Sequence, residues 1–486
     1  METYSLIRMT QPVGELKTLI SLVDRTDFDE YVYPKGETST KFQPNVKPYH
    51  NYTHEVVSFP FTGSPNWGQR ITFSLPWPYQ GDFLTSITLR LKPMSWLPRD
   101  AQQHIGPDVG DWEVLDPDNF WIWANSLGTI AIERAEMEVD GVVVETLDGD
   151  WMNVVHRTSK TISSGISSDD ATASYTNHTV YNFLPSEDGY IYCPLPFWFS
   201  KHVNTAFPMV SCSAIGPDRI RFHITLRPFS DVVRKLVQPK SCDETPLGTS
   251  FQVRDYSFPF RKFQTVSISR TIPGFETADI LCGISHIDGE LRTAYLESPH
   301  ELLMEPVVET VFAEPLKYTI NTSAKDVIKI GLPLTEANGP LRQILFFLRR
   351  TSAIQKFNDW NNYSAMLENE VDPTWNPEQP LLVRGQLMVG TAVWVDEDER
   401  WWRASGNLPL PGGIRSYGNY IYVYNFAEHP NQFSPSGSIN ASRVDLRLHL
   451  TVRPPKDNSE WSVSVFLVGT NWIRFQNGMA NLIFMD

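Results

Sequence analysis

One strand pattern occurs twice in this sequence, 226 residues apart, and it constrains the fold more than any other feature. Residues 221–228 read R-F-H-I-T-L-R-P and residues 447–454 read R-L-H-L-T-V-R-P. In the second copy, apolar and polar residues alternate from Val444 to Arg453. This two-residue period indicates a half-buried β-strand with one apolar face.

The flanks of the two copies repeat as well. Turn residues separate short alternating segments, and the same order of segments, hairpins and long loops appears in both halves. The predicted strands of the first half are residues 55–59, 69–75, 83–91, 132–139, 142–144, 189–192, 194–199, 206–213 and 219–227. Those of the second half are residues 326–330, 341–349, 381–388, 392–395, 419–422 and 447–454.

The repeat is therefore a whole domain of roughly 200 residues. Long loops are predicted at residues 93–125, 147–187 and 396–418, and another passes through Trp360, Asn362 and Pro373. Short antiparallel strands with uneven loops are typical of jelly rolls. We predict an all-β chain of two tandem eight-stranded antiparallel jelly-roll β-sandwiches, a double jelly roll with few short helices.

These patterns divide the chain into three segments. We expect an N-terminal arm at residues 1–48, a first jelly roll with its connector at 49–290, and a second jelly roll at 291–486. Within the arm, residues 16–23 could form one or two amphipathic turns, whereas three prolines that follow them exclude a regular helix.

Composition excludes several classes of protein. The net charge of −15 argues against a large phosphate-binding face, so no direct nucleic-acid binding is expected. A basic patch around Arg254, Arg261 and Lys262 is interpreted as solvated surface. No apolar run is long enough to span a membrane, and the first residues do not resemble a secretory signal. The four cysteines, Cys193, Cys212, Cys242 and Cys282, are expected to be reduced and mostly buried thiols.

No segment predicts a catalytic, cofactor or metal site. His300-Glu301 lacks the second histidine of an H-E-x-x-H zinc motif, so a capped turn is expected. The acidic run 396–400 lacks the spaced ligands of a calcium loop and is interpreted as a solvated hairpin tip. Asp148-Gly149-Asp150 is interpreted as a turn. A catalytic triad hidden among the many serines, histidines and carboxylates is the alternative to a non-enzyme.

The two shared histidines, His223 and His449, lie on the polar face of the repeated strand. A catalytic interpretation would require two identical sites. We expect instead that each imidazole is hydrogen bonded on the sheet face, and that the shared arginines form ion pairs there or between subunits.

Several segments together resemble the major capsid proteins of large icosahedral double-stranded DNA viruses of eukaryotes, the nucleocytoplasmic group. Residues 435–445, P-S-G-S-I-N-A-S-R-V-D, are similar to that family's P-S-G-S-x-N-x-S-R-I-D signature. Further similar segments, in family order, are residues 81–84, 194–199, 206–209, 288–305, 422–432 and 477–480. The similarity runs from about residue 38 to the end of the chain.

The resemblance implies a structural protein that is not an enzyme. It implies homotrimeric capsomers of pseudo-hexagonal outline, which tile the icosahedral shell and contact neighbouring capsomers, minor capsid proteins and penton proteins. It also implies an inner viral membrane beneath the shell, location in the virion, and assembly in the host cytoplasm. The alternatives are a minor capsid or scaffold paralogue and a glycan-binding β-sandwich protein.

Five Asn-x-Ser/Thr sequons occur, at Asn51, Asn177, Asn321, Asn362 and Asn440. Members of the resembled family can be glycosylated outside the host secretory pathway. Asn177 and Asn362 lie in predicted long loops, so they are the candidate glycosylation sites. Asn440 lies in the signature beside a core strand and is interpreted as structural.

Overall fold

The computed structural model describes residues 51–61, 65–94, 120–158, 171–174, 189–217, 219–237, 262–264, 274–312, 327–364, 380–405, 420–430, 434–453 and 460–483. The described residues from Tyr52 onward belong to one compact unit, Tyr52–Asp486. The predicted arm at residues 1–48 lies outside the described residues, as do the side chains of the basic patch considered above.

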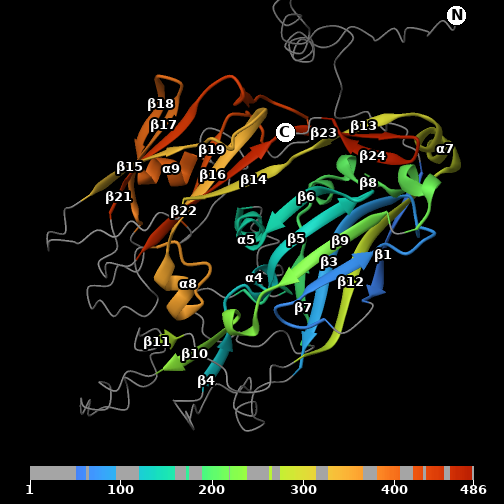
Figure 1. Ribbon diagram of the computed structural model, residues 1–486, viewed down its shortest axis with the longest axis horizontal. Coiled ribbons are helices and arrows are strands. Elements are labelled where there is room, and N and C mark those ends of the chain that lie inside the picture. The colour runs from blue at the N-terminus through green and yellow to red at the C-terminus, as the bar shows by residue number, and fades with distance from the viewer. Residues whose placement is uncertain are drawn as a thin grey trace, which may run out of the picture. The chain divides into compact units, whose positions relative to one another are not determined.

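The first sandwich consists of two antiparallel sheets (Figure 1). One has the order β1-β12-β3-β7 with β8 paired to β3, and the other has the order β2-β9-β5-β6. The strands are β1 Tyr52–Pro60, β2 Arg70–Ser74, β3 Phe83–Pro93, β5 Ile132–Val139, β6 Val142–Asp148, β7 Ile191–Pro194, β8 Phe207–Pro208, β9 Ile220–Leu226 and β12 Phe275–Ile287.

The second sandwich repeats this arrangement with later strands, drawn in yellow to red in Figure 1. Its sheets have the orders β14-β22-β16-β19, with β20 paired to β16, and β15-β21-β17-β18. The strands are β14 Val307–Phe312, β15 Ile328–Pro333, β16 Pro340–Arg350, β17 Leu382–Val389, β18 Ala392–Asp398, β19 Ile421–Asn425, β20 Ile439–Asn440, β21 Leu446–Val452 and β22 Trp461–Gly469.

Each strand of the first sandwich therefore has a counterpart at the same place in the second. The repeated motif forms β9 and β21, which lie between the equivalent strands β2 and β5 and between β15 and β17. The prediction of an all-β double jelly roll is confirmed. The alternation is confirmed too, because Leu446, Leu448 and Leu450 are buried while the residues between them lie on the other face.

A short connector lies between the sandwiches. Helix α7, Gly289–Glu297, begins after Asp288, whose side chain accepts a hydrogen bond of 2.9 Å from the Leu291 backbone N–H. Strand β13, His300–Met304, then pairs with β23, Asn471–Gln476, which also pairs with β24, Met479–Leu482. Among the described residues, no strand before α7 pairs with one after it. The domain boundary at residue 290 remains a prediction.

The segment 206–213 was predicted to be a strand, and this prediction is wrong for most of its length. Only Phe207 and Pro208 form a strand, and a 3-10 helix, η4 Met209–Ile215, follows. Consecutive side chains from Ala206 to Cys212 are buried, so the segment lacks the one-sided burial of a strand. The chain likewise leaves β7 at Pro194, where the predicted strand 194–199 gives way to η2, Trp198–Ser200.

Three predicted loops contain helices. These are α5 Gly149–Thr158, α8 Thr351–Phe357 and α9 Glu399–Ser405. Asp148-Gly149-Asp150 is accordingly not a turn but the junction of β6 with α5, where the first helical turn buries Gly149 and Trp151. The remaining elements are α4 Leu127–Ile130, η3 Val203–Thr205, η5 Phe229–Asp231 and a small sheet of β4 Phe120–Trp123, β10 Val233–Val237 and β11 Lys262–Gln264.

Two further expectations concern the chain as a whole. Cys193, Cys212 and Cys282 are buried free thiols, and Cys242 lies outside the described residues. Burial raises the pKa of each of these three thiols to about 12. Within the described ranges, no helix has the length and apolarity needed to cross a membrane.

Candidate functional site

The two jelly rolls meet at a buried ion pair. Strand β16 carries Arg349, and its guanidinium donates two hydrogen bonds, of 2.7 and 2.6 Å, to the carboxylate of Asp150 in α5. Burial alone would raise the pKa of Asp150, but the charge of Arg349 and its hydrogen bonds outweigh burial and hold that pKa below its ordinary value. The pair therefore joins the first jelly roll to the second in ionised form.

A tryptophan of the second jelly roll extends this contact. Arg349 also donates to the main-chain oxygen of Trp360 (3.2 Å), and the indole N–H of Trp360 donates to the main-chain oxygen of Asp231 (2.9 Å). The guanidinium of Arg227 lies 3.8 Å from the centre of the Trp360 ring, which is cation–π geometry. Arg227 is the second arginine of the first-repeat motif, so the motif contributes directly to the junction.

Asparagine side chains satisfy buried backbone groups across the same junction. Asn358 Nδ2 donates to the main-chain oxygens of Ser230 (2.6 Å) and Val233 (2.7 Å), and Asn361 Nδ2 donates to that of Asn125 (3.1 Å). Such bonds specify one relative orientation, because an unpaired buried polar group is costly. The two jelly rolls are thus docked through directional contacts as well as apolar packing.

A second buried cluster of charges lies around Glu305. Its carboxylate accepts hydrogen bonds from Arg342 and from Lys201 Nζ (3.1 Å). Nearby, Glu145 accepts a hydrogen bond of 2.9 Å from the Trp198 backbone N–H through Oε2, while its Oε1 is buried without a partner. Burial raises the pKa of Glu145 to about 8. This carboxyl is therefore mostly protonated at neutral pH.

The polar faces of the repeated strand differ between the two jelly rolls. His223 is hydrogen bonded to Thr72 (2.9 Å) and to Glu138 (2.9 Å), which confirms the expectation for the first repeat. His449 has no hydrogen-bond partner among the described residues, so the expectation is wrong for the second repeat. The reason lies in the neighbouring strand, where Gly331 takes the place of Thr72 and offers no hydroxyl.

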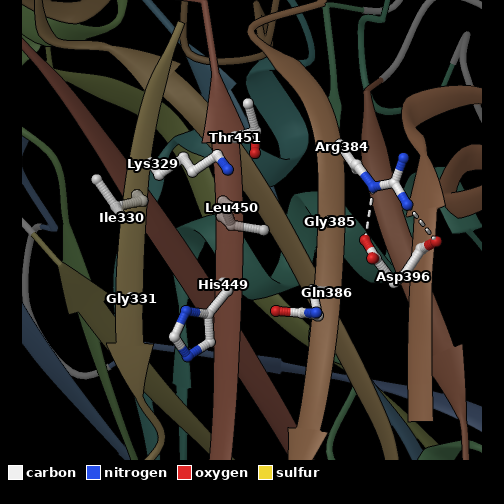
Figure 2. Close-up of a pocket in the computed structure, with 10 residues that line it drawn as sticks. All are labelled: Lys329, Ile330, Gly331, Arg384, Gly385, Gln386, Asp396, His449, Leu450 and Thr451. Atoms are coloured by element: carbon white, nitrogen blue, oxygen red, sulfur yellow. Dashed lines mark hydrogen bonds and ion pairs between the residues drawn. The ribbon is translucent and has the colours of Figure 1, made fainter. Parts of the chain in front are cut away.

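A polar pocket of about 250 Å³ opens beside His449 on the sheet β15-β21-β17-β18 (Figure 2). Side chains from four neighbouring strands surround it. The lining residues are Lys329, Ile330, Gly331, Arg384, Gly385, Gln386, Asp396, His449, Leu450 and Thr451. On one side, Arg384 Nε donates to Asp396 (2.6 Å). This hydrogen bond holds the pKa of Asp396 below its ordinary value.

The structure describes one of the two candidate glycosylation sites. Asn362 is half-buried; its Nδ2 donates to Asp359 (2.9 Å), and its Oδ1 accepts from the backbone N–H (3.0 Å) and hydroxyl (2.7 Å) of Ser364. A glycan on Nδ2 would have to displace the bond to Asp359. Asn177 lies outside the described residues, and glycosylation of either residue remains a prediction.

Two motifs that were weighed as metal sites have other structures. His300 is not in a capped turn but begins β13, where its ring stacks on Phe475 at 5.1 Å between centres. The acidic run is not a hairpin tip: β18 continues to Asp398 and α9 begins at Glu399, because the hairpin turns earlier, at Gly390. The described part of the chain contains no group of three His, Cys, Asp or Glu side chains that could hold a metal ion.

Sequence reasoning missed the junction and the buried charges. One signal was available, because Arg342 and Arg349 lie in a mostly apolar segment, L-R-Q-I-L-F-F-L-R at residues 341–349. Both side chains are buried, at 1% and 7% exposure, and both bind carboxylates. Charged residues within an apolar strand indicate buried ion pairs, although the pattern does not name the partners.

Two tandem sandwiches of identical strand order define a double jelly-roll protein. Comparison with known proteins agrees with this class. A family model described as the major capsid protein N-terminus matches residues 40–246. The major capsid protein of Pyramimonas orientalis virus is 21% identical over 473 residues, covering 94% of this chain and 96% of the relative. That of Spodoptera frugiperda ascovirus 1a is also 21% identical, covering 88% of this chain and 86% of the relative.

Solved structures share the fold. VP54 of PBCV-1 superposes with a TM-score of 0.65 at 15% identity, covering 92% of this chain and all of that one. The Faustovirus major capsid protein superposes with a TM-score of 0.62 at 12% identity, covering 95% of this chain and 96% of that one. Over most of its length the chain is thus similar to major capsid proteins of large DNA viruses, and it shares their double jelly-roll fold.

Proposed function

We propose that this chain is the main building block of an icosahedral viral shell and that it acts as a homotrimer of pseudo-hexagonal outline. One observation carries the proposal: both jelly rolls have the same strand order and the same sheet pairing. Three chains closed about one axis would place six similar sandwiches in a ring. Closed symmetry satisfies repeated interfaces without forming open fibres.

Docking within the chain supports this model. The Asp150–Arg349 pair and the bonds of Asn358 hold the two sandwiches in one orientation. A fixed orientation is what a six-membered ring requires, since a loose joint would give chains of variable curvature. The two sandwiches differ in their loops and polar faces, so three-fold rather than six-fold symmetry is expected.

The proposed partners follow from this role. They are other copies of the chain, minor capsid and penton proteins, and an inner viral membrane beneath the shell. The net charge of −15 favours no direct contact with nucleic acid. The chain would work in the virion after assembly in the host cytoplasm, as a structural protein without enzymatic activity.

Sedimentation velocity and negative-stain microscopy of the purified full chain test the trimer. We expect one species of about 167 kDa, three times the chain mass of 55.5 kDa, with a six-sided outline and three-fold features. Interfaces larger than the ~1,600 Å² of a standard complex should keep it intact at nanomolar concentration. A monomer at micromolar concentration, with no six-sided particles, would refute the proposal. Copy number in purified particles would separate a major shell protein from a minor or scaffold paralogue.

A further inference from the structure

The first repeat neutralises the cations of its polar sheet face with its own carboxylates. Glu136 on β5 forms ion pairs with Arg70 (2.7 Å) and Arg134 (3.0 Å). Glu138, two residues further along the strand, binds His223 (2.9 Å) and Arg221 (3.3 Å). The positive groups of this face are therefore paired within the chain.

The second repeat keeps the basic positions and loses both of these carboxylates. Register makes the comparison direct: Glu136 pairs with His223 in the first repeat and Gln386 with His449 in the second. By the same register, Met388 is the equivalent of Glu138: Met388 lies opposite Arg447, as Glu138 lies opposite Arg221. Lys329 stands where Arg70 stands, each opposite a motif threonine.

Some basic side chains on this face of the second repeat form ion pairs with other carboxylates, and others do not. Arg447 pairs with Asp445 (2.6 Å), the residue before β21, and Arg384 pairs with Asp396 on β18. Figure 2 shows the Arg384 side chain directed toward Asp396 and away from His449. Two basic side chains, Lys329 and His449, are thus left beside the pocket.

Four polar groups around the pocket have no hydrogen bond or ion pair within the described part of the chain. They are the ammonium of Lys329, the imidazole of His449, the amide of Gln386 and the hydroxyl of Thr451. The imidazole lies over Gly331, where an added Cβ would come within 3.3 Å of the ring. All four groups can donate to an anion.

We propose that this pocket binds a carboxylate supplied from outside the chain, held by Lys329, His449 and Gln386, on the sheet face where Glu136 pairs with Arg70 and Glu138 with His223 in the first repeat. An ammonium and an amide bind a single carboxylate with charge-assisted hydrogen bonds. A dianion such as phosphate fits less well for two reasons. Within the described ranges, Lys329 is the one Lys or Arg lining the pocket that forms no salt bridge. In addition, Asp396, Glu397 and Asp398 on β18 add negative charge beside β17.

Two sources could supply this carboxylate: a free carboxylic acid or an acidic side chain of a second copy of the chain. The volume of about 250 Å³ has room for either. A second copy offers many acidic side chains, because the chain carries 56 Asp and Glu residues and 41 Lys and Arg residues. The experiment therefore has two arms.

The first arm titrates the purified full chain with sodium acetate, a single carboxylate, at constant ionic strength, followed by calorimetry. Lys329→Met should weaken binding at least tenfold. Gln386→Glu should do the same, because it restores an internal carboxylate at the position of Glu136, and it should leave the melting temperature unchanged or higher. The matched control is Arg447→Met, which removes the same charge from the same sheet face but from a residue already paired with Asp445; its affinity should stay within twofold.

The second arm treats a mixture of ¹⁵N-labelled and unlabelled assembled protein with a carbodiimide, which joins a lysine amine to a carboxylate in direct contact. Mixed-isotope peptides that link Lys329 to an Asp or Glu identify a second copy as the source. Acetate binding that is lost in Lys329→Met and Gln386→Glu, without such peptides, identifies a free acid. The proposal is overturned if neither binding of the free carboxylate nor mixed-isotope peptides at Lys329 are observed. A link from Lys329 to a residue of its own chain does not count as such a peptide.

Discussion

Arg349 of the second jelly roll binds Asp150 of the first through two hydrogen bonds, of 2.7 and 2.6 Å, although 199 residues separate them. Both side chains are largely buried. A buried ion pair contributes little net stability, but removing one partner leaves the other charge without compensation in a region of low dielectric constant. The pair therefore acts on the specificity of docking, because arrangements that bury one of the two charges without the other are disfavoured.

Replacing Arg349 by Met should destabilise the chain by about 3–5 kcal/mol, because Asp150 would remain buried and unpaired. Urea denaturation measures this loss. Adding Asp150→Asn to the same chain should recover part of it, since the uncompensated charge is then gone. Equal free energies of unfolding for Arg349→Met and for the double variant would show that the two residues are not coupled.

Replacing Leu448 by Asp should abolish soluble expression. Leu448 lies in the middle of β21 and is fully buried, and an unpaired carboxylate there costs several kcal/mol against a total stability of about 5–15 kcal/mol. Arg447→Asp is the matched control, because that residue is adjacent on the strand but exposed. Normal yield and an unchanged melting curve for Leu448→Asp would contradict the strand register.

The sequence was sufficient to predict elements whose signal is local. Alternation around Leu448 identified β21, and the hairpin at Gly390 was placed correctly because turn and strand preferences act over a few residues. The helix that follows Asp398 was missed, since the acidic residues at its start resemble a solvated tip. Its burial against β17 and β19 depends on tertiary contacts: Trp402 donates to the Gly385 oxygen (3.0 Å) and Glu399 is buried.

The candidate site depends on register and so could not be predicted. His223 and His449 lie in nearly identical octapeptides, yet one is hydrogen bonded and the other faces a pocket. The difference comes from residues on neighbouring strands, Thr72 in one repeat and Gly331 in the other. Local sequence does not specify which residues lie opposite one another across a sheet, since that depends on how distant strands align.

Replacing Gly385 by Ala should destabilise the second jelly roll by about 1–3 kcal/mol, the usual cost of overpacking a core. A Cβ at this position would lie 2.5 Å from Nε1 of Trp402, whose ring is buried. Gly289→Ala in α7 is the control, because no atom lies within 4 Å of its added Cβ. In urea denaturation, Gly385→Ala should have a lower midpoint than Gly289→Ala. Equal midpoints would contradict the close approach of Trp402 to the strand.

The last prediction concerns pH and rests on Glu145. Burial raises the pKa of this carboxyl from its ordinary value of 4.5 to about 8. Between these pH values the folded chain holds a proton that the unfolded chain has released. The contribution of Glu145 to stability is therefore full below about pH 4.5 and is lost as the pH rises toward 8, at up to ~1.4 kcal/mol per pH unit.

Replacing Glu145 by Gln should flatten this pH dependence. Gln is neutral at every pH, and its side-chain oxygen can still accept the hydrogen bond from the Trp198 backbone N–H. The variant should melt above the wild type at pH 8, and the difference should shrink as the pH falls toward 5. Glu309, whose pKa burial also raises to about 8, remains in both proteins, so some slope persists. Glu276→Gln, at an exposed ion pair with Lys92, is the control and should leave the slope unchanged. Parallel curves for wild type and Glu145→Gln between pH 5 and 8 would show that Glu145 is ionised in the folded chain.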